Sequence, residues 1–151
     1  MWFKNKIYKS ILLLFSFFAL VSCNSNESKP IKLNSDSCDF CKMTIANGKF
    51  GAELITQKGR YYKFDDVACM IQFDKTSEVP SKVFFVNDYF KENELVAAEK
   101  SFFLKGGTIN SPMRGNFAAF SSDKEQKEFQ TKLNAEPMTW QQVYDSYKWI
   151  N

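Results

Sequence analysis

Apolar and polar positions alternate from Phe50 to Thr56, a pattern typical of a strand with one buried face. Lys58-Gly59 follows as a turn, and a second run continues from Arg60 to Phe64. Two such runs joined by a short glycine-containing segment predict a β-hairpin.

Two aspartates after this hairpin, Asp65 and Asp66, are expected to cap a helix that ends near Phe73. The helix is supported by apolar residues at helical spacing, namely Val67, Met70 and Ile71. Pro80 interrupts the chain beyond it, and the continuous apolar run Val83–Val86 predicts another strand.

A second stretch, which begins at Glu94, repeats this order of elements. Strands are predicted at Leu95–Ala98 and Phe102–Leu104, and the two glycines that follow form a break. A further apolar run predicts a strand at Phe117–Phe120.

Two helices are predicted after that strand. Ser122 and Glu125 have the spacing of a capping box, and they open a helix that carries Phe129 and Leu133. A last helix begins near Thr139. Its apolar face has the i, i+3, i+4, i+7 spacing, at Trp140, Val143, Tyr144 and Tyr147.

The two halves therefore follow the same order of strand, strand and capped helix. Phe64-Asp65-Asp66 before the first helix corresponds to Phe120-Ser121-Ser122 before the second. We expect an α+β fold in which two similar strand-strand-helix halves form one small domain over residues 38–151, a normal size for a single domain.

The N-terminal segment has a different composition. Three lysines lie within its first nine residues, and an apolar run from Ile11 to Val21 leads to Cys23. The run is too short to span a bilayer, which needs about 20 apolar residues. It predicts a lipoprotein signal peptide over residues 1–22, with lipid on Cys23 and a domain in the periplasm or extracytoplasmic space. A short membrane anchor or a buried helix is the alternative.

The charge changes once this segment is set aside. The chain has 20 basic and 17 acidic residues, but the predicted signal peptide contains three of the lysines and no acid. The processed chain would have 17 of each, and therefore no basic excess for a nucleic acid. Residues 23–37 are polar and poor in aromatics, which predicts a lipidated flexible tether.

The chain contains no histidine. This excludes Ser-His-Asp and Cys-His nucleophile arrangements, and also zinc sites that use histidine. Cysteine, methionine and carboxylates remain as metal ligands.

Three thiols remain once Cys23 is acylated: Cys38, Cys41 and Cys69. A C-x-x-C pair such as Cys38 and Cys41 can bind a soft metal, act as a redox dithiol or close a small disulfide. A structural zinc site usually needs four Cys or His ligands, which this chain does not provide. An odd number of thiols also fits poorly with a purely structural disulfide framework.

Two methionines are candidate ligands. If Cys41 to Met43 is extended, their sulfurs face the same side, and thiolate with thioether selects Cu(I). Met113 lies in a Pro- and Gly-bounded loop where no periodicity explains an apolar residue. The alternatives are core packing for Met43 and a loop plug over the core for Met113.

The other candidates have simpler explanations. Met70 lies on the apolar stripe of its helix, which favours core packing, and Cys69 beside it fits a buried thiol. Asp65 and Asp66 are most simply helix caps, with contacts to a metal site or a partner as the lesser alternative. Met138 has no context that distinguishes it.

Several of these features, taken in order, resemble the NosL family, copper-binding lipoproteins that accompany nitrous oxide reductase. The resemblance extends from residue 11 to about residue 134. The matching features are the lipidation motif ending at Cys23, Cys38-x-x-Cys41-x-Met43, Tyr62–Asp66, Cys69-Met70, and Ser111-Pro112-Met113 followed by Phe117–Phe120.

The resemblance implies a Cu(I) chaperone, not an enzyme, that supplies copper for assembling the metal centres of nitrous oxide reductase. It places metal ligands at Cys41, Met43 and Met113, with Cys38 as a further candidate. Lys42 departs from the glycine that the family often has in its C-G-M motif. A coordination scheme that includes histidine cannot apply to this chain.

Two other functions compete with copper delivery. An envelope thiol-disulfide redox lipoprotein would use Cys38 and Cys41, although no βαβ pattern follows them as it would in a thioredoxin-like protein. A structural or adhesive lipoprotein with an incidental disulfide is the third interpretation.

Overall fold

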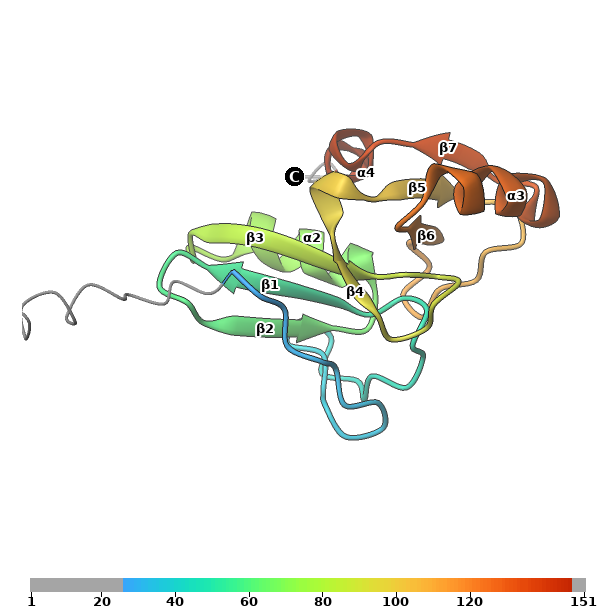
Figure 1. The fold of residues 1–151 in the computed structure, drawn as a ribbon. Coiled ribbons are helices and arrows are strands. Elements are labelled where there is room, and N and C mark those ends of the chain that lie inside the picture. Colours follow the sequence, from blue (N-terminus) through green and yellow to red (C-terminus); the bar gives the residue numbers. More distant parts are fainter. Residues whose placement is uncertain (1–25, 148–151) are drawn as a thin grey trace, which may run out of the picture.

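The computed structural model describes residues 26–147, which form two antiparallel sheets and three α-helices (Figure 1). One sheet has the strand order β2-β1-β3-β4, and the other has the order β6-β5-β7. The predicted signal peptide and Cys23, the predicted site of lipid attachment, lie outside the described residues. Within residues 26–147, no helix has the length and apolar character needed to cross a membrane.

The first half forms as its apolar pattern predicts. Its elements are β1 (Ala52–Thr56), β2 (Tyr61–Phe64), α2 (Val67–Thr76), β3 (Ser81–Asn87) and β4 (Leu95–Ala97). Strand β1 lies in the middle and pairs with β2 as a hairpin on one side and with β3 on the other.

Helix α2 begins at its predicted cap. The Asp66 carboxylate accepts a hydrogen bond from the Ala68 N–H at 2.8 Å, which satisfies one of the free donors of the first turn. The five residues from Val67 to Ile71 are all buried, and this end of the helix packs on β1 and β2.

The second half repeats the connectivity of the first. Its elements are β5 (Phe102–Lys105), β6 (Phe117–Phe120), α3 (Asp123–Leu133), β7 (Glu136–Met138) and α4 (Trp140–Ser146). In each sheet the first strand of the half lies between the second and third strands, as β2-β1-β3 and β6-β5-β7. The predicted α+β fold with two similar strand-strand-helix halves is confirmed.

Three details differ from the sequence prediction. Strand β4 pairs with β3 in the first sheet, so the second half starts at β5 and not at Glu94. Strand β7 was missed because it has three residues, one of them a proline. Ser122 precedes α3 but makes no capping bond, and the capping box instead joins Thr139 and Gln142 at the start of α4.

Alternate residues of the second sheet enter two different cores. Phe103, Phe117 and Ala119 join the larger core, which also contains the buried face of α2. Leu104 and Phe120 point the other way, into a smaller core. Strand β6 is therefore buried on both faces, which explains its continuous apolar sequence.

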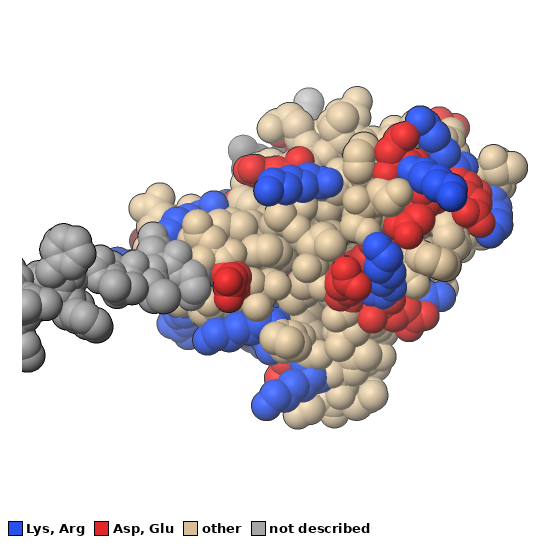
Figure 2. All heavy atoms as spheres, in the orientation of Figure 1, with Lys and Arg blue, Asp and Glu red and all other residues tan. Residues whose placement is uncertain are grey.

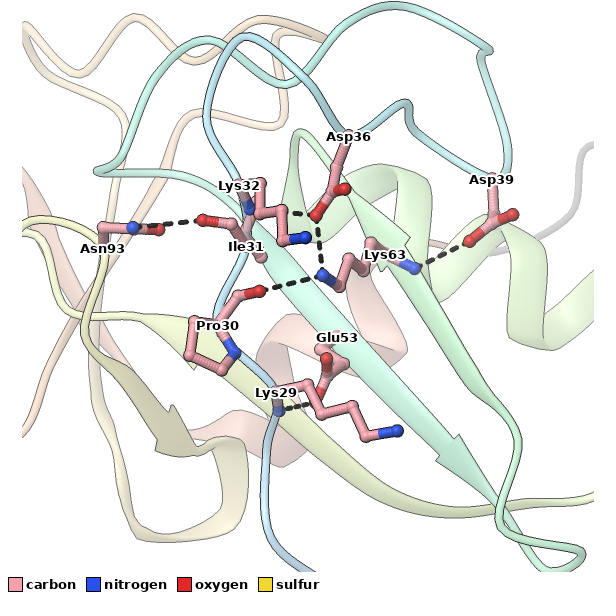
Figure 3. Close-up of polar contacts among 9 residues, drawn as sticks. All are labelled: Lys29, Pro30, Ile31, Lys32, Asp36, Asp39, Glu53, Lys63 and Asn93. Carbon is pink, nitrogen blue, oxygen red and sulfur yellow. Dashed lines mark hydrogen bonds and ion pairs between the residues drawn. The ribbon is translucent and has the colours of Figure 1, made fainter.

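The chain before Cys38 is packed on the first sheet as a segment we call the N-terminal strap, residues 29–36 (Figure 3). The Lys29 N–H donates to Glu53 at 2.9 Å, and the Asn93 side chain donates to the Ile31 carbonyl at 3.1 Å. The Lys63 ammonium donates to Asp36 at 2.6 Å. Ile31 is buried beneath these contacts.

The strap therefore differs from the predicted flexible tether, which extended to residue 37. Its composition is polar, but its bonds go to β1, to β2 and to the loop before β4. Because these partners are more than 20 residues away in sequence, local composition does not reveal them. The folded domain begins near Lys29 rather than at Cys38.

Charges are mixed on the surface over helix α3 (Figure 2). Basic and acidic side chains lie next to one another there, as in the i, i+4 pairs Lys127–Asp123 and Lys132–Glu128. This part of the surface offers no basic stripe of the kind that binds a nucleic acid.

Candidate metal centre

The Cys38–Met43 segment forms a tight turn. The Cys38 N–H donates to the Met43 carbonyl at 2.8 Å, and the Lys42 N–H donates to the Cys38 carbonyl at 3.0 Å. Lys42 closes the turn in the left-handed region, with φ of 66°. Cys41 to Met43 is therefore not extended. The expectation that Cys41 and Met43 share one face assumed an extended segment, and that assumption is wrong.

The turn is fastened to strand β2 by Asp39. The Asp39 N–H donates to the Lys63 carbonyl at 2.7 Å, and the Lys63 N–H donates to the Asp39 carboxylate at 2.8 Å (Figure 3). These two bonds attach the turn to the edge strand of the first sheet. They place the C-x-x-C pair beside the end of β2 and the start of α2.

Three thiols and one carboxylate meet at this corner. The sulfur atoms of Cys38, Cys41 and Cys69 and one carboxylate oxygen of Asp65 all lie within 4.8 Å of one another. Cys69 comes from the first turn of α2, and Asp65 from the residue that follows β2. Cys38 and Cys69 are fully buried, whereas Cys41 is partly exposed.

The thiols differ in how readily they ionise. A hydrogen bond from the Cys69 thiol lowers the pKa of Cys38 to about 6. The pKa of Cys69 is raised by the same bond, in which Cys69 keeps its proton, and by burial. Burial raises the pKa of Cys41 to about 11. Cys38 therefore ionises first, and a metal must displace protons from the other two.

Asp65 contacts the most accessible thiol. The Cys41 S–H donates to its carboxylate at 3.5 Å, within the range for a sulfur donor. Asp65 is itself buried. Three soft sulfur donors with one carboxylate, in a chain without histidine, suit Cu(I) better than a hard cation.

Asp66 links the helix to the loop that carries Met113. One carboxylate oxygen caps α2, and the other accepts from the Ser111 hydroxyl at 2.6 Å and from the Met113 N–H at 3.0 Å. Gly115 is required here, because a Cβ at this position would lie 2.7 Å from an Asp66 oxygen. Asp66 is thus both a cap and an anchor for the Met113 loop.

The methionines differ in solvent exposure. Met43 is 53% exposed and Met113 is 37% exposed, so neither is a core residue or a plug. Met70 is fully buried, which confirms the expectation of core packing. The Met43 backbone is bonded to Cys38 of the thiol cluster, and the Met113 backbone is bonded to Asp66, which follows Asp65 of the cluster in sequence.

Sequence reasoning missed part of this site. It treated Cys69 as a buried thiol and Asp65 chiefly as a cap, with contact to a metal site as the lesser alternative, yet both join the cluster. The signal lay in their spacing: Cys69 is in the first turn after the Asp66 cap, so it must lie near the end of the preceding strand.

Comparison with known proteins identifies similar chains. The NosL family matches residues 30–148. The crystal structure of the copper chaperone NosL from Shewanella denitrificans has a similar fold, with a TM-score of 0.70 and 16% sequence identity; the match covers 82% of this chain and 99% of that chain. No curated protein matches the sequence.

Proposed function

This chain belongs to the NosL family, and we propose that it is a membrane-anchored Cu(I) metallochaperone that delivers copper for assembly of nitrous oxide reductase. The observation that carries the proposal is the group of three thiols at one corner of the fold, with exposed methionines on the adjoining segments. Soft sulfur ligands without histidine favour Cu(I).

The ligands in this proposal are Cys41, Met43 and Met113, with Cys38 as a further ligand. Cys41 is the only partly exposed thiol of the three, and both methionines are accessible to solvent. Segments far apart in sequence supply them, and Asp66 holds the second segment in place. Because the thioethers are neutral, Cys41 supplies the charge that binds the ion.

Accessible ligands suit a donor of copper. A site with few ligands leaves room for an incoming ligand of the recipient to bind before the old ligands leave. Copper bound by the exposed Met43 and Met113 would lie at the surface, where such an exchange can occur. A copper site enclosed by the core would have to open first.

The proposed anchor is lipid on Cys23, with the domain in the periplasm or extracytoplasmic space. Since the strap is packed from Lys29 onward, only six residues would separate it from the lipid. Six residues span at most about 20 Å when fully extended. The copper site would therefore work close to the membrane surface.

Delivery is tested in cells by the copper content of nitrous oxide reductase. We expect reductase from cells that lack this chain to be depleted of copper, and the wild-type chain to restore it. Cys41→Ser should fail to restore it, and Met70→Leu, a matched change in the core, should succeed. Fully copper-loaded reductase in cells without the chain would refute the proposed delivery.

A thiol-disulfide redox function is the alternative, and the lowered pKa of Cys38 favours it. The fold provides less support, because the C-x-x-C turn leads into strand β1 and no helix begins at it. Anaerobic titration separates the two functions. A copper chaperone binds Cu(I) in the dithiol form and loses it when Cys38 and Cys41 are oxidised, whereas unchanged affinity after oxidation would remove the C-x-x-C pair from the copper site.

A further inference from the structure

The ligands proposed for delivery leave one thiol of the cluster without a role. Cys69 is fully buried, and its sulfur lies within 4.8 Å of both Cys38 and Cys41. A buried cysteine is often no more than a small apolar side chain. Here it faces two other thiols, and its partner Cys38 is also inaccessible from the surface.

We propose that Cys41 is shared by two Cu(I) positions. The outer one is completed by Met43 and Met113, and the inner one is formed with Cys69 and with Cys38, the buried further ligand of the proposed function. This inference rests on the proposed function and extends it. Cys41 is suited to the shared place because it is partly exposed while its sulfur belongs to the buried cluster.

The cluster has the size that an inner position requires. A thiolate binds a soft metal ion at about 2.3 Å, so one ion reaches sulfurs up to about 4.6 Å apart. The three sulfurs already lie within 4.8 Å of one another. Binding would therefore need only small side-chain movements, and it would not require the turn to unfold.

Charge decides which position is favoured. In the outer position Cu(I) meets one thiolate and two neutral thioethers, so the site has no net charge. In the inner position three thiolates surround one ion and leave an excess of negative charge, and buried excess charge is costly. The Asp65 carboxylate contacts the shared Cys41, so it lies beside both positions. Copper therefore occupies the outer position first and takes the inner one when the thioethers are disengaged.

Transfer of copper from the outer to the inner position needs no oxidant or reductant. The metal remains Cu(I), its bonds to Met43 and Met113 break, and bonds to Cys38 and Cys69 form. The proton that Cys69 holds, and that of Cys38 where it is still present, are released to water as the new bonds form. The inner position would keep copper on the protein and away from solvent.

Chelator competition on methionine variants tests the inner position. We expect Met43→Leu and Met113→Leu each to weaken Cu(I) binding by about tenfold. The double variant should also bind Cu(I) no more than about tenfold less tightly than wild type. Copper then moves to the inner position, so the two effects are not additive. Met70→Leu, a buried methionine outside the cluster, is the matched control and should bind like wild type.

Two further measurements use the double variant. Cys69→Ala in that background should remove at least another tenfold of affinity, roughly the loss expected when a metal site loses a supporting group. X-ray absorption of the copper-loaded double variant should show three sulfur neighbours. The spectrum needs no change at Cys69, so the test holds even if Cys69→Ala does not fold.

The outcomes separate this inference from the proposed function. A wild-type protein that fails to bind Cu(I) would overturn the proposed function itself. Wild-type binding with a loss of about a hundredfold in the double variant, the additive result, would overturn only the inner position. A single sulfur neighbour in that variant, or no effect of Cys69→Ala, would also overturn it.

Discussion

Lys42 has an unfavourable backbone conformation between two proposed copper ligands. Its φ of 66° is in the left-handed region, which costs a residue with a Cβ about 1–2 kcal/mol relative to glycine. The sequence resemblance already marked this position, because the family often has glycine there. The structure supplies the reason, since the turn from Cys38 to Met43 closes at this residue.

Lys42→Gly should therefore raise the free energy of unfolding by about 0.5–1 kcal/mol and leave Cu(I) affinity unchanged. Denaturant unfolding measures the first effect, and chelator competition measures the second. Thr44→Gly is the control, because Thr44 is an exposed residue of the same loop with no left-handed φ, and it should lose stability. Equal losses in both variants would show that the turn is not strained at Lys42.

At the scale of elements, local pattern predicted the parts whose partners are close in sequence. The β1–β2 hairpin and α2 follow from alternation, a turn and a capping aspartate. The N-terminal strap could not be predicted this way, because its polar groups are satisfied by Glu53, Lys63 and Asn93 in other elements. Tertiary contacts, rather than local propensity, decide such segments.

The candidate site, too, could be predicted from the sequence only in part. Cys38 and Cys41 stand out by their spacing, and the exposed methionines by their motifs and loop context. Cys69 does not stand out, because its role depends on how α2 is placed against the turn. The three-thiol cluster emerges only when the Cys38–Met43 turn, β2 and α2 are assembled.

Asp66 joins helix α2 to the loop that carries Ser111 and Met113, and Asp66→Asn tests that junction. Asparagine still caps a helix through its amide oxygen, but the amide nitrogen that replaces the other oxygen can accept a hydrogen bond from neither Ser111 nor Met113. We expect a loss of about 1–3 kcal/mol in unfolding free energy. Cu(I) affinity should fall by about tenfold as the Met113 loop loosens.

Ser122→Ala is the matched control for Asp66→Asn. Ser122 also precedes a helix, but its side chain makes no capping bond. Its replacement should change the free energy of unfolding by less than about 0.5 kcal/mol. If Asp66→Asn changes the free energy of unfolding as little as Ser122→Ala does, Asp66 is only a cap and the Met113 loop is held by other contacts.

At the scale of the whole molecule, the two halves are joined by a shared core and by Asp88. Its carboxylate accepts from the N–H groups of Phe90 and Lys91 at 2.8 and 2.9 Å, and from Ser121 at 2.7 Å. Ser121 follows strand β6, so this one side chain ties the loop after β3 to the second half. The arrangement keeps the two sheets in a fixed relation around the larger core.

Asp88→Asn should destabilise the protein by about 1–3 kcal/mol at neutral pH, because an amide cannot accept all three bonds. Burial alone would raise the pKa of Asp88, but the hydrogen bonds from Ser121, Lys91 and Phe90 outweigh it and lower the pKa below its usual value. The stabilisation is therefore present above about pH 4 and is lost as the pH falls through the lower folded pKa.

Unfolding of wild type and Asp88→Asn at pH 7 and near pH 3 measures this difference. The gap in free energy between the two proteins should narrow at the lower pH, because below about pH 4 the unfolded wild-type chain takes up a proton that the hydrogen-bonded Asp88 of the folded protein resists. A gap that is the same at both values would mean that the ionised carboxylate does not hold the two halves together.

The central claim is that Cys41 binds Cu(I), and anaerobic titration of the reduced protein against a competing chelator tests it most directly. Wild type should compete for Cu(I), and Cys41→Ser should lose at least about a hundredfold in affinity, with circular dichroism unchanged. Met70→Leu should bind like wild type, since Met70 is buried in the core. If Cys41→Ser binds like wild type while Met70→Leu does not, the copper site lies on helix α2 and the account is contradicted.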